Sequence, residues 1–143
     1  MKITFDTNVI ISALYSKRGA SYRLLSACLA GGLEYAVSPL VALEYEGKIY
    51  QKIDEGFLKI RRKDITKILD AFFAFAVIVW DPVRIRPVLS DPSDDKILEC
   101  AISGHCTHII TFNKKHFPLG LIRLYGVVAI PPGEFLKIWR KKP

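Results

Sequence analysis

Residues 2–8 read KITFDTN, a short strand-like run that leads directly into one acidic and two polar residues with no glycine between them. The run at residues 2–5 predicts a short buried strand, and Asp6 then lies at its carboxyl end. In open parallel α/β sheets, ligands and catalytic groups collect at this edge because the loops converge over the strand ends. Asp6 is therefore the first candidate functional residue.

Outward from this strand, strand-like and helix-like segments alternate along the chain without a linker or repeat. Gly31-Gly32 is a typical helix stop, Ser38-Pro39 a typical helix start, and Ser93 a typical cap. The alternation predicts a parallel sheet covered by helices on both faces. We predict strands at residues 2–5, 34–37, 77–80, 107–111 and 127–130, and helices at 9–14, 20–30, 39–51, 54–62, 64–75, 94–103 and from 132 onward.

The length and composition predict one domain over residues 1–143 with a sizeable core, since 50% of the residues are hydrophobic. The longest apolar run, residues 71–80, is about half the length that spans a bilayer, and no signal-peptide pattern precedes the first strand. Cys28, Cys100 and Cys106 do not resemble a disulfide framework. We therefore expect a soluble, cytoplasmic protein with no membrane attachment.

The formal net charge is +7, and the basic residues are clustered. Lysine and arginine neutralise phosphates and release counterions whatever the base sequence, so this charge favours a polyanionic partner such as a nucleic acid. The alternative is a basic surface that only keeps the protein in solution. The clusters are Lys59, Arg61, Arg62 and Lys63; Lys114, Lys115 and His116; and Arg140, Lys141 and Lys142.

Acidic and amide side chains gather at the predicted carboxyl edge of the sheet. Asp94 and Asp95 open the helix before the fourth strand, Asn113 follows that strand, and Glu44 lies in the second turn of the helix after the second strand. Mg²⁺ and Mn²⁺ favour such oxygen donors, with bound waters completing the octahedron. A metal there lowers the pKa of a water and stabilises charge on a phosphate. With the basic surface, this pattern predicts phosphodiester hydrolysis.

Each of these residues also has a purely structural interpretation. Asp6 can cap the following turn, and Asp94 and Asp95 are first-turn acids that the helix dipole favours. Glu44 can be a solvated helix residue, and Asn113 a turn residue. The catalytic interpretation depends on their joint placement.

Four motifs follow one another in order and resemble those of the PIN-domain ribonucleases, most closely the toxin-like branch similar to the VapC toxins of prokaryotic toxin–antitoxin pairs. The resemblance covers nearly the whole chain. The motifs are Asp6-Thr7-Asn8-Val9-Ile10, Ser38-Pro39 with Glu44-Tyr45, Asp91-Pro92-Ser93-Asp94-Asp95-Lys96 with Ala101, and Ile109-Ile110-Thr111-Phe112-Asn113.

The resemblance implies a three-layer α/β/α sandwich with a central parallel sheet of about five strands. It also implies a Mg²⁺- or Mn²⁺-dependent endoribonuclease that cleaves single-stranded RNA, often as a homodimer, with an antitoxin protein as partner in the toxin branch. Asp6 and Asp94 match the main metal ligands, Glu44 the second acidic position and Asn113 the fourth. Asp95 would support the metal through water.

Two features refine this assignment. Asp94 shares a helical face with apolar residues that face the sheet, which favours it over Asp95 as the primary ligand. The family often has Asp at the position of Asn113, and His116 stands where some relatives have a nearby Asp, so a second metal would bind weakly. Lys114 and Lys115, beside this position, are candidate RNA contacts.

Other functions stay open at this point. The sequence at residues 6–8 distantly resembles the nucleophile loop of haloacid-dehalogenase-like phosphatases, which normally has a second Asp where this chain has Asn8. His105, Cys106 and His108 suggest zinc, but their spacing fits no standard structural site. The third alternative is a catalytically weak or inactive PIN fold that binds RNA or protein, which needs the basic surface but no metal.

Overall fold

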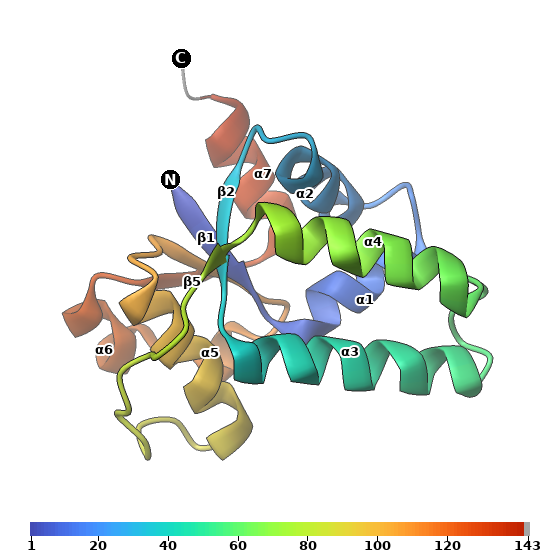
Figure 1. Ribbon diagram of the computed structural model, residues 1–143. Helices are drawn as coiled ribbons and strands as arrows, with labels where there is room; N and C mark the ends of the chain where they lie inside the picture. Colours follow the sequence, from blue (N-terminus) through green and yellow to red (C-terminus); the bar gives the residue numbers. More distant parts are fainter. Residues whose placement is uncertain (142–143) are drawn as a thin grey trace.

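The computed structural model describes residues 1–141, so Lys142 of the third basic cluster lies outside the described residues. Two 3₁₀ turns, Lys114–His116 and Arg123–Tyr125, flank the short helix α6. In chain order (Figure 1), the elements are β1 (Lys2–Phe5), α1 (Thr7–Tyr15), α2 (Ala20–Leu29), β2 (Glu34–Val37), α3 (Pro39–Asp54), α4 (Arg62–Phe75), β3 (Val77–Ile78), α5 (Pro92–Ser103), β4 (His108–Ile110), α6 (Leu119–Ile122), β5 (Val128–Ile130) and α7 (Pro132–Arg140).

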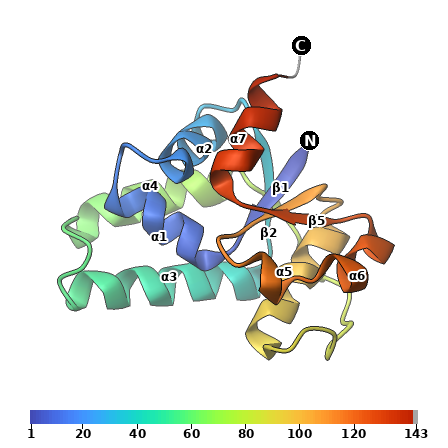
Figure 2. The same ribbon diagram turned by 180° about the vertical axis from the view of Figure 1, so that it is seen from behind.

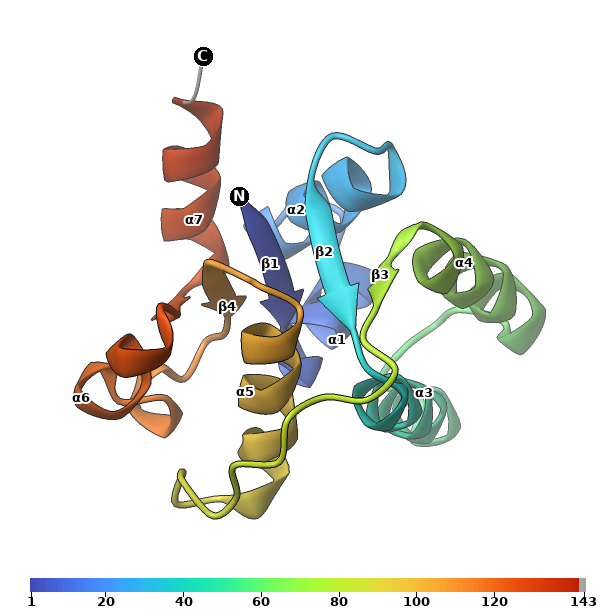
Figure 3. The ribbon, with the colours of Figure 1, turned by 60° about the vertical axis from the view of Figure 1, so that its left-hand side comes forward.

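The five strands form one sheet in the order β3-β2-β1-β4-β5, and every pairing is parallel. β1 lies in the centre, with Ile3 opposite Tyr35 of β2 and His108 of β4. Helix α5 covers one face of the sheet, and α1 and α2 lie behind the other (Figure 3). Helix α7 packs against α2 on that second side (Figure 2). The predicted three-layer α/β/α fold with a five-stranded parallel sheet is therefore confirmed.

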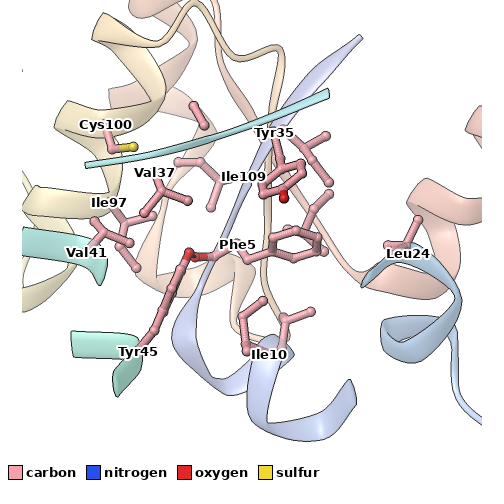
Figure 4. Close-up of a cluster of buried hydrophobic side chains, with 14 of the residues drawn as sticks. Phe5, Ile10, Leu24, Tyr35, Val37, Val41, Tyr45, Ile97, Cys100 and Ile109 are labelled. Carbon is pink, nitrogen blue, oxygen red and sulfur yellow. Dashed lines mark hydrogen bonds between the residues drawn. The ribbon is translucent and has the colours of Figure 1, made fainter. Parts of the chain in front are cut away.

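Two buried tyrosines connect the core to the strand ends (Figure 4). The Tyr45 hydroxyl of α3 donates to the carbonyl oxygen of Phe5, the last residue of β1, and the Tyr35 hydroxyl donates to the carbonyl oxygen of Phe72. Because a buried hydroxyl without a partner is costly, these bonds fix where α3 and α4 lie on the sheet. Tyr45 thereby holds the end of β1, which leads into Asp6.

The helix predicted at residues 54–62 is wrong. Helix α3 instead continues to Asp54, residues 55–61 form a loop, and α4 begins at Arg62. The cause is Gly56, whose φ of 79° lies in the left-handed region that ends helices. The N–H groups of Phe57 and Leu58 then turn back to the carbonyl oxygen of Lys52, at 2.9 and 3.1 Å.

Other predicted bounds shift by a few residues. The expected short helical turn at residues 9–14 is the full helix α1, and the strand expected at 77–80 is reduced to Val77–Ile78. Helix α5 begins at Pro92, and its cap is Asp91 rather than Ser93: the Ser93 N–H donates to the Asp91 carboxylate at 2.9 Å. The remaining strands agree with the prediction to within one residue, while α6 and the two 3₁₀ turns were not predicted.

Two of the basic clusters differ in how far their charge is neutralised. In the cluster around the start of α4, Arg61 pairs with Asp64 and Arg62 with Asp54 on the surface. Lys114 and Lys115 of the second cluster form an exposed 3₁₀ turn after β4.

Cys28, Cys100 and Cys106 are free and buried. Within residues 1–141, no helix has both the length and the apolar composition needed to cross a bilayer.

Candidate functional site

Asp6 lies at the carboxyl end of β1 and is held there by the neighbouring strand. Its N–H donates to the Ile110 carbonyl oxygen at 2.9 Å, and the Thr111 hydroxyl donates to Asp6 Oδ2 at 2.8 Å. Thr111 is fully buried, and its Oγ1 also accepts from the Asn113 N–H at 3.0 Å. One threonine therefore positions both Asp6 and the turn that carries Asn113. Sequence reasoning missed this residue.

Glu44 projects from α3 toward α1 and α5. The Thr7 hydroxyl at the start of α1 donates to Glu44 Oε2, and Lys96 of α5 forms an ion pair with Glu44 Oε1 at 3.0 Å. Both side chains of the pair are largely shielded from solvent, with 24% and 16% of their area exposed. Three helices thus fix the Glu44 carboxylate. Neither Thr7 nor Lys96 was predicted to have this role.

Asp94 lies in the first turn of α5, with 6% of its area exposed. Its Oδ2 atom is buried and has no hydrogen-bond partner among the described residues. The imidazole of His116 lies nearby, with its Nδ1 atom 3.4 Å from Oδ2. Buried carboxylate oxygens without a partner are costly. Asp95 Oδ2 is also unpartnered, but of the two residues Asp94 is the one that lines the pocket, so Asp94 Oδ2 is placed to accept an ion or a ligand group.

The four predicted catalytic residues, Asp6, Glu44, Asp94 and Asn113, line one pocket of about 270 Å³. The carboxyl ends of β1 and β4, α3 and the first turn of α5 contribute its walls. His116 lines the same pocket. The structure therefore brings the four predicted residues together from distant parts of the sequence, between Asp6 and Asn113, as expected from the shared sheet edge.

The pocket raises the pKa of two of its carboxyl groups. Burial is the main cause for Asp6, whose pKa is raised, and the negative charge of Glu44 adds to it, while the Thr111 hydrogen bond opposes it. Burial, and then the charge of Asp6, raise the pKa of Asp94 to about 6. The carboxylates thus repel one another in a place that is poor in water. A bound cation would relieve this repulsion.

The structure places Asp95 outside the pocket. Asp95 is fully buried, and its Oδ1 accepts from the backbone N–H groups of Leu89 at 2.9 Å and Val88 at 3.3 Å. It does not belong to the residues that line the pocket. Its observed role is to attach the segment before α5 to that helix, and Asp94 is the first-turn acid that faces the pocket.

Lysines reach the pocket from a different element than predicted. Lys114 and Lys115 do not line it, whereas Lys48 and Lys52 of α3 do. Because Lys48 and Lys52 follow Glu44 by four and eight residues, they share its helical face. This spacing is the signal in the sequence that could have identified them.

The residues present fit a hydrated divalent cation better than a fully protein-ligated one. Among residues 1–141, no three His, Cys, Asp or Glu side chains are grouped so that they could hold a metal ion together. Mg²⁺ usually keeps several waters and is bound through only one or two carboxylates. The unpartnered Asp94 Oδ2 and the neighbouring Asp6 carboxylate meet that requirement.

Comparisons with known proteins agree with this fold. A family model for the PIN domain matches residues 2–115, so the chain belongs to the PIN domain family. In structure the chain is similar to a chain of VapBC2 from Rickettsia felis, solved bound to a DNA fragment from their promoter. The TM-score is 0.57, with 17% sequence identity over 92% of this chain and 98% of that chain. A search of curated proteins found no significant match.

Proposed function

We propose that this protein is a Mg²⁺- or Mn²⁺-dependent endoribonuclease that cleaves single-stranded RNA. The observation that carries the proposal is the pocket in which Asp6, Glu44 and Asp94 meet, with raised pKa values for Asp6 and Asp94. Membership of the PIN domain family supports a nuclease. The excess of positive charge supports a nucleic-acid substrate.

In this proposal, Asp6 and Asp94 hold the cation, and Asn113 offers it a neutral amide oxygen. When bound, the cation would lower the pKa of a water and stabilise the charge that develops on the phosphate. The Thr111 hydrogen bond holds Asp6 in place and favours its ionised form. Glu44, held by Thr7 and Lys96, is positioned to orient or deprotonate a water in the pocket. Asp95 has no role at the cation.

Further parts of the proposal concern partners. We infer that the protein is the toxin component of a toxin–antitoxin pair, because the VapBC2 chain from Rickettsia felis has a similar fold over nearly its full length. A homodimer and an antitoxin partner stay predictions of the family resemblance.

Three free, buried cysteines are consistent with a reducing compartment, which supports a site of action in the cytoplasm.

The decisive experiment measures cleavage of a labelled single-stranded RNA by purified protein with Mn²⁺. Asp6→Asn should abolish cleavage and leave the fold and most of the RNA affinity intact, because the lost charge serves the transition state rather than strand binding. Asp70→Asn, at an exposed position of α4, is the matched control and should cleave like the wild type. EDTA should stop the reaction in both active proteins.

Asn113→Asp separates a weak enzyme from an inactive binding module. A carboxylate at this position would strengthen the second metal position, so the variant should cleave faster at low Mn²⁺ concentration. If the wild type and Asn113→Asp both bind RNA but neither cleaves it at any metal concentration, the chain is a PIN-fold binding module. Cleavage that survives both EDTA and Asp6→Asn belongs to a contaminant.

A further inference from the structure

The pocket changes its charge along its length. At one end lie the carboxylates, and at the other it is lined by Ile11 of α1 and by Lys48, Gln51 and Lys52 of α3. Helices α1 and α3 leave the same edge of the sheet and lie next to each other in both views (Figures 1 and 2). The pocket therefore continues from the candidate cleavage site along a basic wall of α3.

An exposed pair of aromatic rings lies beyond this basic end. Tyr15, the last residue of α1, and Phe57, in the loop after α3, have ring centroids 4.6 Å apart and planes 13° apart. Lys52, which lines the pocket, places its Nζ 5.5 Å from the centre of the Phe57 ring. The three side chains thus form a continuous path from the pocket to the stacked rings.

The aromatic pair is unusually open to solvent. Tyr15 is 63% exposed and Phe57 45% exposed, so burial in the core does not explain their position. The left-handed Gly56 ends α3, and the Phe57 N–H that follows donates to the Lys52 carbonyl oxygen, which fixes the start of this segment. Because the two stacked rings are already held in place, they lose little further side-chain freedom when a flat group binds to them.

We propose that Tyr15 and Phe57, with Lys48 and Lys52, form a subsite that holds the RNA strand outside the cleavage position. A base stacks on the open face of the aromatic pair, and the two lysines contact phosphates on the way to the carboxylates. Single-stranded nucleic acid is recognised by this combination of a basic groove with aromatic stacking surfaces. The subsite rests on the proposed ribonuclease function, since it names how that substrate is held.

Charge favours RNA over a protein partner at this surface. Lys48 and Lys52 line the same pocket as the carboxylates of the candidate cleavage site. Glu55 is the exception, because it accepts from Gln51 at 2.9 Å and pairs with Lys52 at 3.4 Å. This exposed carboxylate competes with a phosphate for Lys52. Its removal should therefore strengthen RNA binding.

The test is the affinity of the full chain, in EDTA, for a short labelled single-stranded RNA. Tyr15→Ala should weaken binding about tenfold, while Tyr15→Phe should bind like the wild type because the stacking ring is retained. Lys48→Ala should lower the slope of log affinity against log salt by about 0.7. Glu55→Gln should bind more tightly than the wild type.

Matched controls are Phe75→Ala and Lys67→Ala, which remove an exposed ring and an exposed lysine on α4, away from the pocket. Both should bind like the wild type. A series of RNAs, each lacking one base, adds a direct readout of stacking. At one position of the series, removal of the base should weaken binding to the wild type but leave binding to Tyr15→Ala unchanged.

Three results separate the possible failures. If folded Tyr15→Ala and Lys48→Ala bind RNA as the wild type does, the subsite is wrong and the aromatic pair belongs to a protein interface. If the wild type binds no RNA, the subsite is also wrong. If Tyr15→Ala weakens binding but the wild type does not cleave with Mn²⁺, the subsite stands and the ribonuclease proposal fails.

Discussion

Asp6 and Asp94 have raised pKa values because the fold withdraws both from water and places them near each other. The folded protein therefore carries an electrostatic cost when both groups are ionised. Thr111 reduces that cost at Asp6, and His116 contacts Asp94 at 3.4 Å. A residue pair under this repulsion is suited to binding a cation rather than to stabilising the fold.

Asp94→Asn should stabilise the protein without metal at neutral pH. The folded pKa of about 6 lies above the ordinary value of 3.8, so the wild type loses stability as pH rises from about 4 through 6. The variant lacks this loss, and after solvent screening we expect a gain of about 1 kcal/mol at pH 7, or roughly 2–4 °C in melting temperature. The advantage should vanish below about pH 4.

Thermal unfolding from pH 3 to 8 in EDTA measures this effect, with Asp70→Asn as the control. Equal melting temperatures of Asp94→Asn and the wild type across the whole pH range would contradict the assigned repulsion.

Thr111→Val should damage the site through Asp6. The substitution removes the buried donor to Asp6 Oδ2 and the acceptor for the Asn113 N–H, which should cost about 2 kcal/mol of stability. It should also raise the pKa of Asp6 further, because the hydrogen bond favours the ionised form. The acidic limb of the pH–rate profile should therefore move to higher pH.

Thr66→Val is the control, since the exposed Thr66 hydroxyl contacts the Arg62 carbonyl oxygen at 2.9 Å and the Tyr50 hydroxyl at 3.1 Å, and neither residue lines the pocket. An unshifted pH profile in a destabilised Thr111→Val protein would mean that Thr111 only supports the fold.

At the scale of elements, α5 organises the segment before it as well as the pocket. Residues 79–91 contain no helix or strand, but the backbone N–H groups of Ile85, Val88 and Leu89 donate to buried carboxylates of α5. Asp95 accepts from Leu89, and Glu99 accepts from Ile85 at 2.9 Å and from the Arg86 guanidinium at 2.7 Å. Although burial opposes ionisation, these hydrogen bonds hold the pKa of Glu99 below its usual value. Asp95, a candidate ligand in the sequence, and Glu99 both hold this segment on α5.

Glu99→Ala should loosen this segment while leaving the pocket residues unchanged. The Ile85 N–H and the Arg86 guanidinium would lose their acceptor, which should cost about 2 kcal/mol. Urea unfolding measures the loss, and limited proteolysis should cut residues 79–91 sooner than in the wild type. Glu46→Ala, on the partly exposed side of α3, should change neither measurement. Unchanged proteolysis of Glu99→Ala would show that Asp95 alone anchors the segment.

At the scale of the whole molecule, the strand order decides where the pocket lies. The chain passes from β1 to β2 and β3 on one side and then returns to β4 and β5 on the other side of β1. The order therefore reverses between β1 and β4, and the loops after these strands diverge to leave a crevice at their carboxyl ends. Asp6 follows β1, and Thr111 and Asn113 follow β4.

Because this crevice holds repelling carboxylates, Mn²⁺ should stabilise the folded chain. At a concentration one hundred times its dissociation constant, a cation that binds only the folded state adds about 2.7 kcal/mol. The melting temperature should rise with Mn²⁺ for the wild type and Asp70→Asn, and rise far less for Asp6→Asn and Asp94→Asn. Calorimetry that detects no Mn²⁺ or Mg²⁺ binding at millimolar concentration would contradict the hydrolytic proposal.

Local patterns in the sequence were sufficient for most of the architecture. These patterns depend on only a few neighbouring residues. Examples are the strand composition, the helix stop at Gly31-Gly32 and the helix start at Ser38-Pro39. The order of strands and helices could therefore be predicted, and with it the parallel sheet. The helix predicted at 54–62 failed because Gly56, a single left-handed residue, ends α3. Helix α6 and the 3₁₀ turns are too short for periodicity to identify them.

By itself, the sequence determined that Asp6 ends a strand and that Asp94 opens a helix, since both follow from neighbours in the chain. Only the tertiary structure decided which groups surround them. Thr111 meets Asp6 across 105 residues, and Lys96 of α5 meets Glu44 of α3. The tertiary structure also places the Asp95 side chain outside the pocket. Adjacent helical positions point in different directions, and the Asp95 carboxylate accepts from the backbone N–H groups of residues 88 and 89.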